Sequence, residues 1–455
     1  MITRQSSKEK KRDLIFDNKT LAMLIFPLLI EQLLAVFVGM ADTIMIASVG
    51  EAAVSGVSLV DGVMNLFITL FAALATGGAV IAGQYLGYRD RKNADKAASQ
   101  LIQFMLVSSL VITVLLYLGK SFILHQVFGA IDGDVEGHAN TYLMIVSASI
   151  PFIAIYNGGA AIFRTMGNSK ISMLVSIVMN AVNVAGNAFL IYGCHFGTAG
   201  VAIPTLVSRI TAAVLILVLL MHSKGLIRLE KIRKLQFDWG MIHKILRIGI
   251  PNGLENSMFQ LGKILVLSLV ASFGTSAIAA NAVSNTVAMF QILPGMSINL
   301  AVTTVIARCI GAGDHRQAEY YTKKLMILIY LAMLVVNGGI YFALPEILKI
   351  YNLTAQTADT AHQILLFHSV FAVTIWPVSF SLPCTLRAAG DVKVPMYISI
   401  ASMWIFRIVF SYVLGQYLGM GVFGIWVAMI IDWCFRSICM IVRYKKGKWK
   451  LLKSI

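Results

Sequence analysis

The chain has 455 residues, of which 58% are hydrophobic and 13% are charged, and its mean hydropathy is +0.80. Soluble domains carry about 25% charged residues and need that polar surface to stay dissolved, so the composition excludes a soluble enzyme. Its apolar runs have the length of about 20 residues that a helix needs to cross a hydrocarbon core of roughly 30 Å. The sequence predicts an all-α integral membrane protein.

The formal net charge is +16, with 37 Lys and Arg residues against 21 Asp and Glu residues. In membrane proteins basic residues gather in cytoplasmic loops, so the excess indicates topology, and we expect no nucleic-acid partner. The five cysteines form no CxxC pair, which argues against a disulfide framework or a metal site. We expect no cofactor and no metal other than a coupling Na⁺.

Twelve segments are long and apolar enough to be transmembrane helices. Their expected ranges are 20–47, 52–83, 97–124, 139–162, 170–192, 199–222, 243–273, 277–307, 323–350, 361–386, 394–417 and 421–443. Every second loop is basic, from the stretch Arg4 to Lys19 at one end to Arg443 to Lys453 at the other. By the positive-inside rule, both termini are predicted to be cytoplasmic.

The two halves of the sequence are related by a repeat. One constant shift along the chain aligns Pro27 with Pro251 and Glu31 with Glu255. A shift shorter by a single position aligns FRTMGNSKISM with LRAAGDVKVPM. Because six helices per half is an even number, both halves enter the membrane in the same orientation, as in the parallel repeats of some secondary transporters.

The sequence therefore predicts an N-terminal lobe at 1–222 and a C-terminal lobe at 243–455, joined by a basic cytoplasmic linker at 223–242. Two like lobes around a central cleft can open that cleft to alternate sides of the membrane. No Walker A sequence is present to couple ATP hydrolysis, so we expect an ion gradient to drive transport.

Several segments resemble the multidrug and toxic compound extrusion (MATE) transporters of the prokaryotic NorM-like and DinF-like branches. They are PLLIEQLLAVFVGMADTIMIASVG, GQYLGYRDRKNADKA, FRTMGNSK, NVAGNAFLIYG, IPNGLENSMFQ, GAGDHRQAE and LRAAGDVKVP, and they extend from about residue 20 to 440. The resemblance implies a V-shaped fold of two six-helix lobes around a cavity. It also implies export of organic, often cationic, compounds in exchange for H⁺ or Na⁺.

Ionisable residues inside a membrane span are costly and mark candidate functional sites. In the first lobe, counting residues from the outer loops places a layer of oxygen-bearing side chains roughly 8–16 Å inside the outer face. Its members are Asp42, Asn183, Asn187, Thr205 and Asp61, and Asn180 is a further candidate on the same segment as the other two asparagines. Such oxygens can hold a small hard cation or a proton, although an interhelical hydrogen-bond cluster is the alternative.

The resemblance implies that the first four of these residues form the cation site of the family, with Asn187 replacing an acid found in some members. It also implies a second-lobe site with acids on the seventh and tenth helices. Glu255 matches the first of these acids, but the second position holds Trp376, so this site is incomplete.

Four other residues of the second lobe are expected about 14–16 Å from the outer face. They are Lys263, His368, Arg407 and Asp432. We expect a charge cluster in which Asp432 neutralises Lys263 or Arg407, serving either as a static salt bridge or in coupling.

Candidate substrate-lining residues are Glu31, Gln32, Met258, Phe259, Gln260, Phe290, Gln291 and Met296. Thioethers and aromatic rings suit flat apolar cations, through flexible packing and cation–π contact. Glu31 and Glu255 each follow a proline by four residues, so a structural role for both stays open.

The sequence thus predicts a secondary antiporter that exports small organic cations, is a monomer and resides in the cell (inner or plasma) membrane of a bacterium or archaeon. An enzyme is not expected, because no HExxH or Cys–His arrangement is present. The alternatives are a lipid-linked precursor flippase of the same superfamily and a major-facilitator-type transporter. A flippase should have a more cationic cavity for anionic headgroups, whereas Glu31, Asp42 and Glu255 favour cations.

Overall fold

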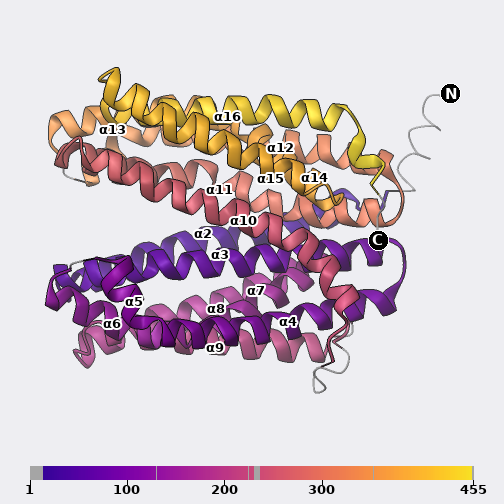
Figure 1. The fold of residues 1–455 in the computed structure, drawn as a ribbon. Coiled ribbons are helices and arrows are strands. Elements are labelled where there is room, and N and C mark those ends of the chain that lie inside the picture. The colour runs from indigo at the N-terminus through magenta and orange to yellow at the C-terminus, as the bar shows by residue number, and fades with distance from the viewer. Residues whose placement is uncertain (1–13, 130, 224, 230–235, 352, 453–455) are drawn as a thin grey trace. The chain divides into compact units, whose positions relative to one another are not determined.

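The computed structural model describes residues 14–129, 131–223, 225–229, 236–351 and 353–452, and within these ranges the chain forms helices and no strand (Figure 1). Ten helices are long and apolar enough to cross a membrane, and two bent helix pairs raise the number to twelve if each pair is one span. The predicted all-α membrane fold is confirmed. Of the predicted basic segments, residues 4–13, 224, 230–235 and 453 lie outside the described ranges.

The chain divides into two compact units, of which the first comprises residues 22–253. Its helices are α2 (Asn18–Ala47, from residue 22 on), α3 (Glu51–Gly87), α4 (Arg91–Leu118), α5 (Lys120–Phe122), α6 (Gly133–Ser147), α7 (Ile150–Thr165), α8 (Ser169–Ala188), α9 (Ala199–Met221) and the start of α10 (Trp239–Ala271). The π-helical turns η1 (Ile123–Val127) and η2 (Phe189–Gly193) extend α5 and α8. This unit therefore includes the predicted linker and the first half of α10 as well as six predicted spans.

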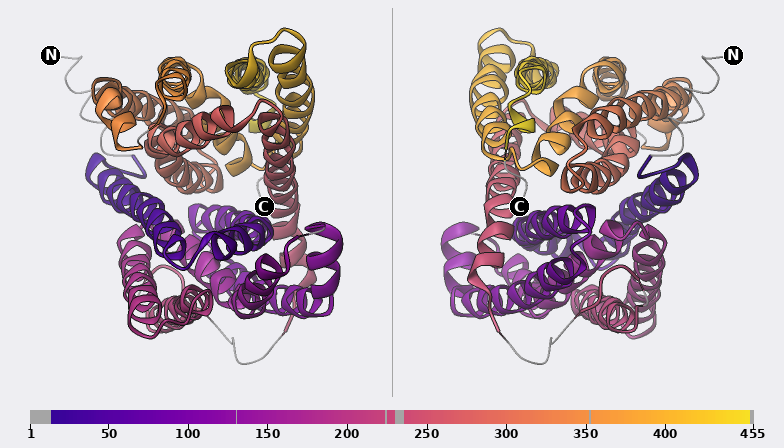
Figure 2. Two further views of the ribbon diagram at one scale, coloured as in Figure 1. Left: turned by 90° about the vertical axis from the view of Figure 1, so that its left-hand side faces the viewer. Right: turned by 90° about the vertical axis from the view of Figure 1, so that its right-hand side faces the viewer.

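The second unit comprises the described residues 14–21 and 254–452. It holds the rest of α10, α11 (Thr275–Gly311), α12 (His315–Ile350), α13 (Ala355–Thr374), η3 (Pro377–Ser381), α14 (Leu382–Ala388), α15 (Lys393–Ser402), η4 (Met403–Val409), η5 (Tyr412–Tyr417), α16 (Gly421–Lys445) and η6 (Lys448–Lys450). In each unit the long helices are seen nearly end-on in Figure 2 and run roughly alongside one another.

Two spans that the sequence predicts as single helices are broken. The segment expected at 139–162 consists of α6 and α7, which meet at 48°, and the segment expected at 361–386 consists of α13 followed by η3 and α14, bent by 56°. Pro151 and Pro377 lie at the start of the second piece in each case. A proline has no N–H to donate to the preceding turn, which explains both breaks.

Close helix contacts depend on two glycines. A Cβ at Gly186 would lie 2.7 Å from the Cβ of Pro204, so α8 and α9 approach at this point more closely than a larger residue allows. In the second unit, a Cβ at Gly295 of α11 would lie 2.1 Å from the ring of Trp376. The first contact positions the polar residues of α8 against α9, and the second buries Trp376.

The repeat seen in the sequence is also visible in how helices begin. Asp90 caps α4 by accepting a hydrogen bond from the N–H of Asn93 at 3.1 Å, and Asp314 caps α12 by accepting one from the N–H of Gln317 at 2.9 Å. The shift that aligns Pro27 with Pro251 also aligns these two aspartates, so the same cap occurs at equivalent places in both halves.

Candidate functional site

In the first unit, three helices bring four of the predicted cation-site residues together. Asn187 of α8 donates a hydrogen bond to Oδ1 of Asp42 of α2 at 2.6 Å, and its amide lies 3.5 Å from Oδ1 of Asn183. Asn183 in turn donates to the hydroxyl of Thr205 of α9 at 3.1 Å. Asn183 and Asn187 are one turn apart on α8, next to the close approach at Gly186. The predicted grouping of these four side chains is therefore present as a hydrogen-bonded chain.

One oxygen of this group has no partner in the described part of the chain. Oδ1 of Asn187 is buried and accepts no hydrogen bond there, whereas buried amide oxygens are normally satisfied. The side chain of Asn187 is fully buried, and the oxygen belongs to a set with one carboxylate, a second amide and a hydroxyl. Small hard cations prefer such oxygen ligands, so the residues present fit a coupling Na⁺.

Asp61 belongs to a neighbouring group that the sequence identified only in part. Tyr142 of α6 donates a hydrogen bond to Oδ1 of Asp61 of α3 at 3.0 Å. Arg209 of α9 donates to the hydroxyl of Ser149 at 2.7 Å, where α6 and α7 meet. The guanidinium is also within electrostatic range of Asp42 and Asp61.

Tyr142 and Arg209 were not predicted as site residues. Arg209 lies in the middle of an apolar span, and this position was the signal in the sequence that could have identified it. The remaining first-unit candidate, Asn180, has a long hydrogen bond of 3.4 Å to Ser176 on its own helix. It is therefore not part of the hydrogen-bonded chain that starts at Asp42.

Glu31 is buried in an ion pair inside the first unit. One carboxylate oxygen lies 3.5 Å from Arg164 of α7 and accepts a hydrogen bond from Tyr156 at 3.3 Å. The other accepts one from Ser172 of α8 at 2.9 Å. Its charge and both of its oxygens are satisfied within the unit, which supports the structural role that the sequence left open, and its contact with substrate stays a prediction.

Glu255 has the equivalent arrangement in the second unit. Nη2 of Arg387 donates to both of its carboxylate oxygens, at 2.8 and 2.9 Å. The expected acid position on the tenth span is occupied by Trp376, which is buried and stacks on Phe380 at a centroid distance of 5.1 Å. Glu255 is thus paired with a cation instead of a second acid.

The predicted charge cluster of the second unit exists, but its ion pair is a different one. Asp432 of α16 is fully buried, accepts a hydrogen bond from Ser402 and lies 3.5 Å from Nη2 of Arg436. Asp432 is also within electrostatic range of Arg407, as predicted, but neither Arg407 nor Lys263 forms its close ion pair. Arg436 is one helical turn from Asp432 on the same helix. Side chains at this spacing are already neighbours, so their pairing loses less conformational entropy than a pair between two helices.

Lys263 and Arg407 share an aromatic neighbour. The ammonium nitrogen of Lys263 lies 5.2 Å from the ring centroid of Phe259, and the guanidinium carbon of Arg407 lies 4.8 Å from it. Both distances are within the range of cation–π contact. Within the described residues, neither cation lies within 4.0 Å of a carboxylate oxygen.

His368 and Gln291 form a buried polar network. Oε1 of Gln291 pairs with Nδ1 of His368, and its amide nitrogen donates to Ser369 at 2.5 Å. The imidazole packs edge-on against the rings of Trp426 and Trp433, at 5.3 and 5.4 Å. Gln291 is fully buried within the unit, so the prediction that it lines a substrate cavity is wrong.

The other predicted lining residues are accessible to different degrees. Met296 is exposed, whereas five residues are half-buried: Gln32, Met258, Phe259, Gln260 and Phe290. Accessibility alone does not assign them to a substrate surface, and their role stays a prediction.

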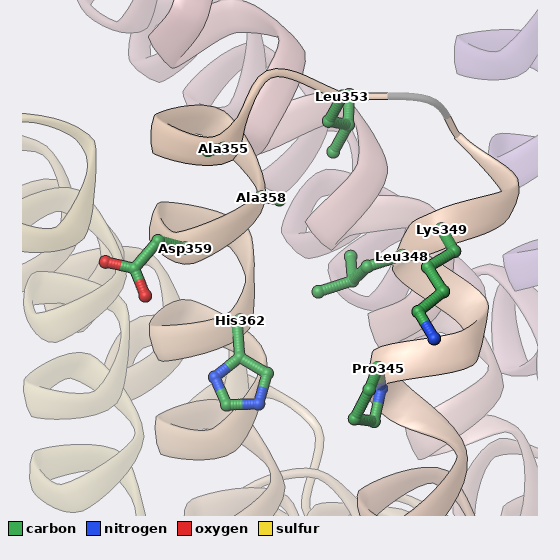
Figure 3. A pocket seen from close by; sticks show the side chains of 8 residues that line it. All are labelled: Pro345, Leu348, Lys349, Leu353, Ala355, Ala358, Asp359 and His362. Atoms are coloured by element: carbon green, nitrogen blue, oxygen red, sulfur yellow. The ribbon is translucent and has the colours of Figure 1, made fainter.

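A hollow of about 590 Å³ lies elsewhere, between the end of α12 and the start of α13 (Figure 3). Its lining includes Lys349, Asp359 and His362. Lys349 is paired with Glu346, and Asp359 accepts a hydrogen bond from Gln363. None of the predicted site residues lines it, and we do not assign it to the functional site.

Comparison with known proteins connects this geometry to a family. The MatE family model matches the chain twice, at residues 27–189 and 251–413. The chain belongs to the MatE family. The second match is displaced from the first by the same shift that relates Pro27 to Pro251 in the sequence repeat. MatE proteins are transporters, which confirms the predicted family and excludes the major-facilitator alternative.

Relatives of the MatE chain cover almost its whole length. It is 30% identical to the uncharacterized transporter YisQ of Bacillus subtilis over 447 residues, with 95% of each chain covered. It is 26% identical to the probable multidrug resistance protein NorM of Thermotoga maritima, covering 95% of this chain and 93% of that protein. The chain is therefore a multi-pass membrane transporter of a multidrug efflux family.

Solved structures show the same fold. An outward-facing multidrug resistance MATE family transporter of the MOP superfamily superimposes with a TM-score of 0.87 at 20% identity, over 96% of this chain and 97% of that one. A MOP superfamily transporter from Pyrococcus furiosus superimposes with a TM-score of 0.86 at 22% identity, over 94% and 95% of the two chains.

Proposed function

We propose that this MatE protein exports small organic compounds across the cell membrane in exchange for H⁺ or Na⁺, and that the ion binds at Asp42, Asn183, Asn187 and Thr205. The observation that carries the proposal is the buried, unpartnered Oδ1 of Asn187 beside the carboxylate of Asp42, within the described part of the chain. A cation bound there would supply the missing partner. Displacing it when the lobe rearranges is a means of coupling ion entry to substrate exit.

The proposed orientation follows from the charges of the loops. Basic side chains in every second loop place both termini in the cytoplasm by the positive-inside rule. We propose the inner or plasma membrane of a prokaryotic cell as the location and a monomer as the working form. Apart from the coupling ion, no cofactor is needed for this mechanism.

Two of the three carboxylates that favour cationic substrates are paired with arginines. The resemblance implies organic, often cationic, compounds, and the carboxylates of Glu31, Asp42 and Glu255 favour cations over the anionic headgroups that a flippase binds. Glu31 and Glu255 are each paired with an arginine, and Asp42 belongs to the proposed ion site. The remaining support for cationic substrates is that the chain contains 22 Met and 24 Phe residues. Such side chains suit flat apolar cations through flexible packing and cation–π contact.

The cations Lys263 and Arg407 favour a second candidate function, the flipping of a lipid-linked precursor with an anionic headgroup. A flippase was expected to have a more cationic interior, and these two cations have no carboxylate partner among the described residues. Transport of a fluorescent anionic lipid in the absence of soluble substrates distinguishes this function from export.

The proposed function is tested in proteoliposomes under separate H⁺ and Na⁺ gradients, with the wild type, Asp42→Asn and Asn187→Ala. A fluorescent zwitterionic dye such as rhodamine B serves as the exported compound. Asp42→Asn removes the charged ligand, and we expect gradient-driven export to fall at least tenfold while the protein stays folded. Asp359→Asn, at the hollow between α12 and α13, is the matched control. Unchanged coupled export by Asp42→Asn would refute the assignment of the ion site.

A further inference from the structure

Intramembrane charges are distributed differently in the two units. The ion pairs Glu31–Arg164 and Glu255–Arg387 neutralise themselves within their own units. Among the remaining groups described above, the first unit has two carboxylates, Asp42 and Asp61, and one guanidinium, Arg209.

Around Phe259 the balance has the opposite sign. Lys263, Arg407 and Arg436 face a single carboxylate, that of Asp432, which leaves a net charge of +2 for this group. Arg407 is within electrostatic range of Lys263, Asp432 and Arg436. An excess of buried or half-buried cations is costly unless an anion compensates it.

Lys263 and Arg407, the two cations nearest Phe259, have hydrogen-bond donors without a protein acceptor in the described part of the chain. Lys263 is exposed and Arg407 is half-buried, and their side chains donate no hydrogen bond to any protein atom within the described ranges. Arg436 is 3% exposed and is paired through Nη2 with Asp432 at 3.5 Å, while its Nε has no hydrogen-bond partner in that part of the chain. Donors of this kind are suited to a carboxylate, which a guanidinium can bind with two parallel hydrogen bonds.

The position of these cations argues against contact with lipid tails or with the headgroups of the bilayer. Lys263 lies eight residues before the end of α10 at Ala271, which is about 12 Å of helix. Arg407 lies in η4, in the middle of the span Lys393–Tyr417. Charged groups at this depth normally face a water-filled cavity, so an accessible lysine there indicates access from water.

The helix α10 and the turn η4 lie close together next to Lys263. A Cβ at Gly262, the residue before Lys263, would lie 2.8 Å from the sulfur of Met403 in η4. The ring of Phe259 also contacts Phe380, with a centroid distance of 6.5 Å, and Phe380 carries Arg436 over its face at 4.8 Å. The cations are therefore arranged on a rigid aromatic framework.

We propose that Lys263, Arg407 and Phe259 form a binding site for an anionic group, a carboxylate on an aromatic compound, and that this group belongs to the compound that the protein exports. The site rests on the proposed export function and specifies its substrate class. Lys263 and Arg407 bind the carboxylate, and Phe259 together with the neighbouring aromatic side chains contacts the apolar ring. Exported compounds are then aromatic acids or zwitterions.

The test is equilibrium binding of three probes to the purified full-length protein in phosphatidylcholine nanodiscs. The probes are 2-naphthoate, its neutral amide 2-naphthamide, and a naphthyl trimethylammonium cation. The change in fluorescence of the protein's tryptophans reports binding. We expect wild-type protein to bind naphthoate at least tenfold more tightly than either of the other two probes. Equal affinity for naphthoate and naphthamide would overturn the proposal without any variant being made.

Variants assign the binding to the two cations. Lys263→Gln/Arg407→Gln should reduce naphthoate affinity at least tenfold and leave naphthamide affinity unchanged, whereas Lys263→Arg/Arg407→Lys keeps both charges and should retain naphthoate binding. Lys324→Gln is the control, because Lys324 also lies over an aromatic ring, that of Tyr320 at 5.5 Å. Equal losses in the neutral and charge-conserving variants would overturn the role of charge.

Two further outcomes distinguish a site for lipid phosphate from a site for exported compounds, and failure of the proposed export function from failure of the proposed site. If phosphatidylglycerol in the nanodiscs abolishes naphthoate binding, the site takes a lipid phosphate and the proposal is overturned. Binding needs no gradient, so intact naphthoate binding together with absent gradient-driven export contradicts the proposed function and leaves the site standing.

Discussion

Arg387 binds both carboxylate oxygens of Glu255 from a single guanidinium nitrogen, at 2.8 and 2.9 Å. The pair joins α10 to α14, and the side chains of Arg387 and Glu255 are only 15% and 11% exposed. Glu31 and Arg164 occupy the aligned positions of the first half, with their charged atoms 3.5 Å apart. The repeat therefore preserves an ion pair in each unit, and neither carboxylate is available as an isolated negative charge.

Glu255→Gln should destabilise the protein. It leaves the buried guanidinium of Arg387 without its counter-charge, and removing one partner of a buried pair costs about 3–5 kcal/mol. The midpoint of thermal unfolding in detergent measures the effect. Glu346→Gln is the control, because its pair with Lys349 is exposed on both sides and such pairs contribute about 0–1 kcal/mol. Wild-type stability with weakened substrate binding would instead support the direct role expected from sequence.

Arg209→Gln should strengthen binding of the coupling cation in the first unit. The guanidinium is within electrostatic range of Asp42 and Asp61, and a nearby positive charge opposes the binding of another cation. The hydrogen bond from Nη1 of Arg209 to Ser149 is lost with the shorter glutamine side chain, so the unfolding midpoint is measured alongside transport. We expect the Na⁺ or H⁺ concentration for half-maximal export to fall severalfold. A rise in that concentration contradicts the assignment of the ion site.

Gln291→Leu tests whether this residue is a structural or a substrate-lining residue. The change leaves His368 and Ser369 without their buried partner, and each unsatisfied buried group costs about 1–3 kcal/mol. We expect a lower unfolding midpoint with an unchanged order of preference among exported compounds. Met296→Leu, at an exposed position of the same helix, should leave stability nearly unchanged. An altered substrate preference at unaltered stability would restore the prediction from sequence.

Asp90 gives a prediction about pH, because it lies outside the membrane spans. Hydrogen bonds from the backbone and side chain of Asn93 lower the pKa of Asp90 below its usual 3.8. The stabilisation is therefore complete above about pH 4 and is lost as the pH falls through the lower pKa of the folded protein.

The variant Asp90→Ala removes this cap, and such changes cost about 0.5–2 kcal/mol at neutral pH. The stability difference from wild type should shrink in acid, as measured by unfolding between pH 3 and 7. Asp90→Ser is the control, since serine caps without a titrating charge and should lose no stability by this route in acid. A difference between wild type and Asp90→Ala that is constant over this pH range contradicts the explanation.

Part of the candidate site could be predicted from sequence, because helix periodicity and depth are local properties. Asn183 and Asn187 had to share a face, and Asp42 and Thr205 had to lie at similar depths. Arg209 was not predicted, because the prediction rests on the carboxylates and amides of the spans as the ligand-bearing residues, although Arg209 is also a charged residue in an apolar span. The close pair of Asp432 with Arg436 was missed because depth alone does not distinguish a partner on the same helix from one on another helix.

The sequence by itself determined the membrane class, the repeat and the family, and it predicted twelve spans, because each of these depends on the length, order and spacing of residues along the chain. Only the tertiary structure decided which intramembrane charges are neutralised. Glu31 meets Arg164 and Glu255 meets Arg387 although the partners lie far apart along the chain, and such contacts depend on how each helix is rotated about its axis. As a result, Glu31 and Glu255 are neutralised by arginines. Among the described residues, no carboxylate oxygen lies within 4.0 Å of Lys263 or Arg407.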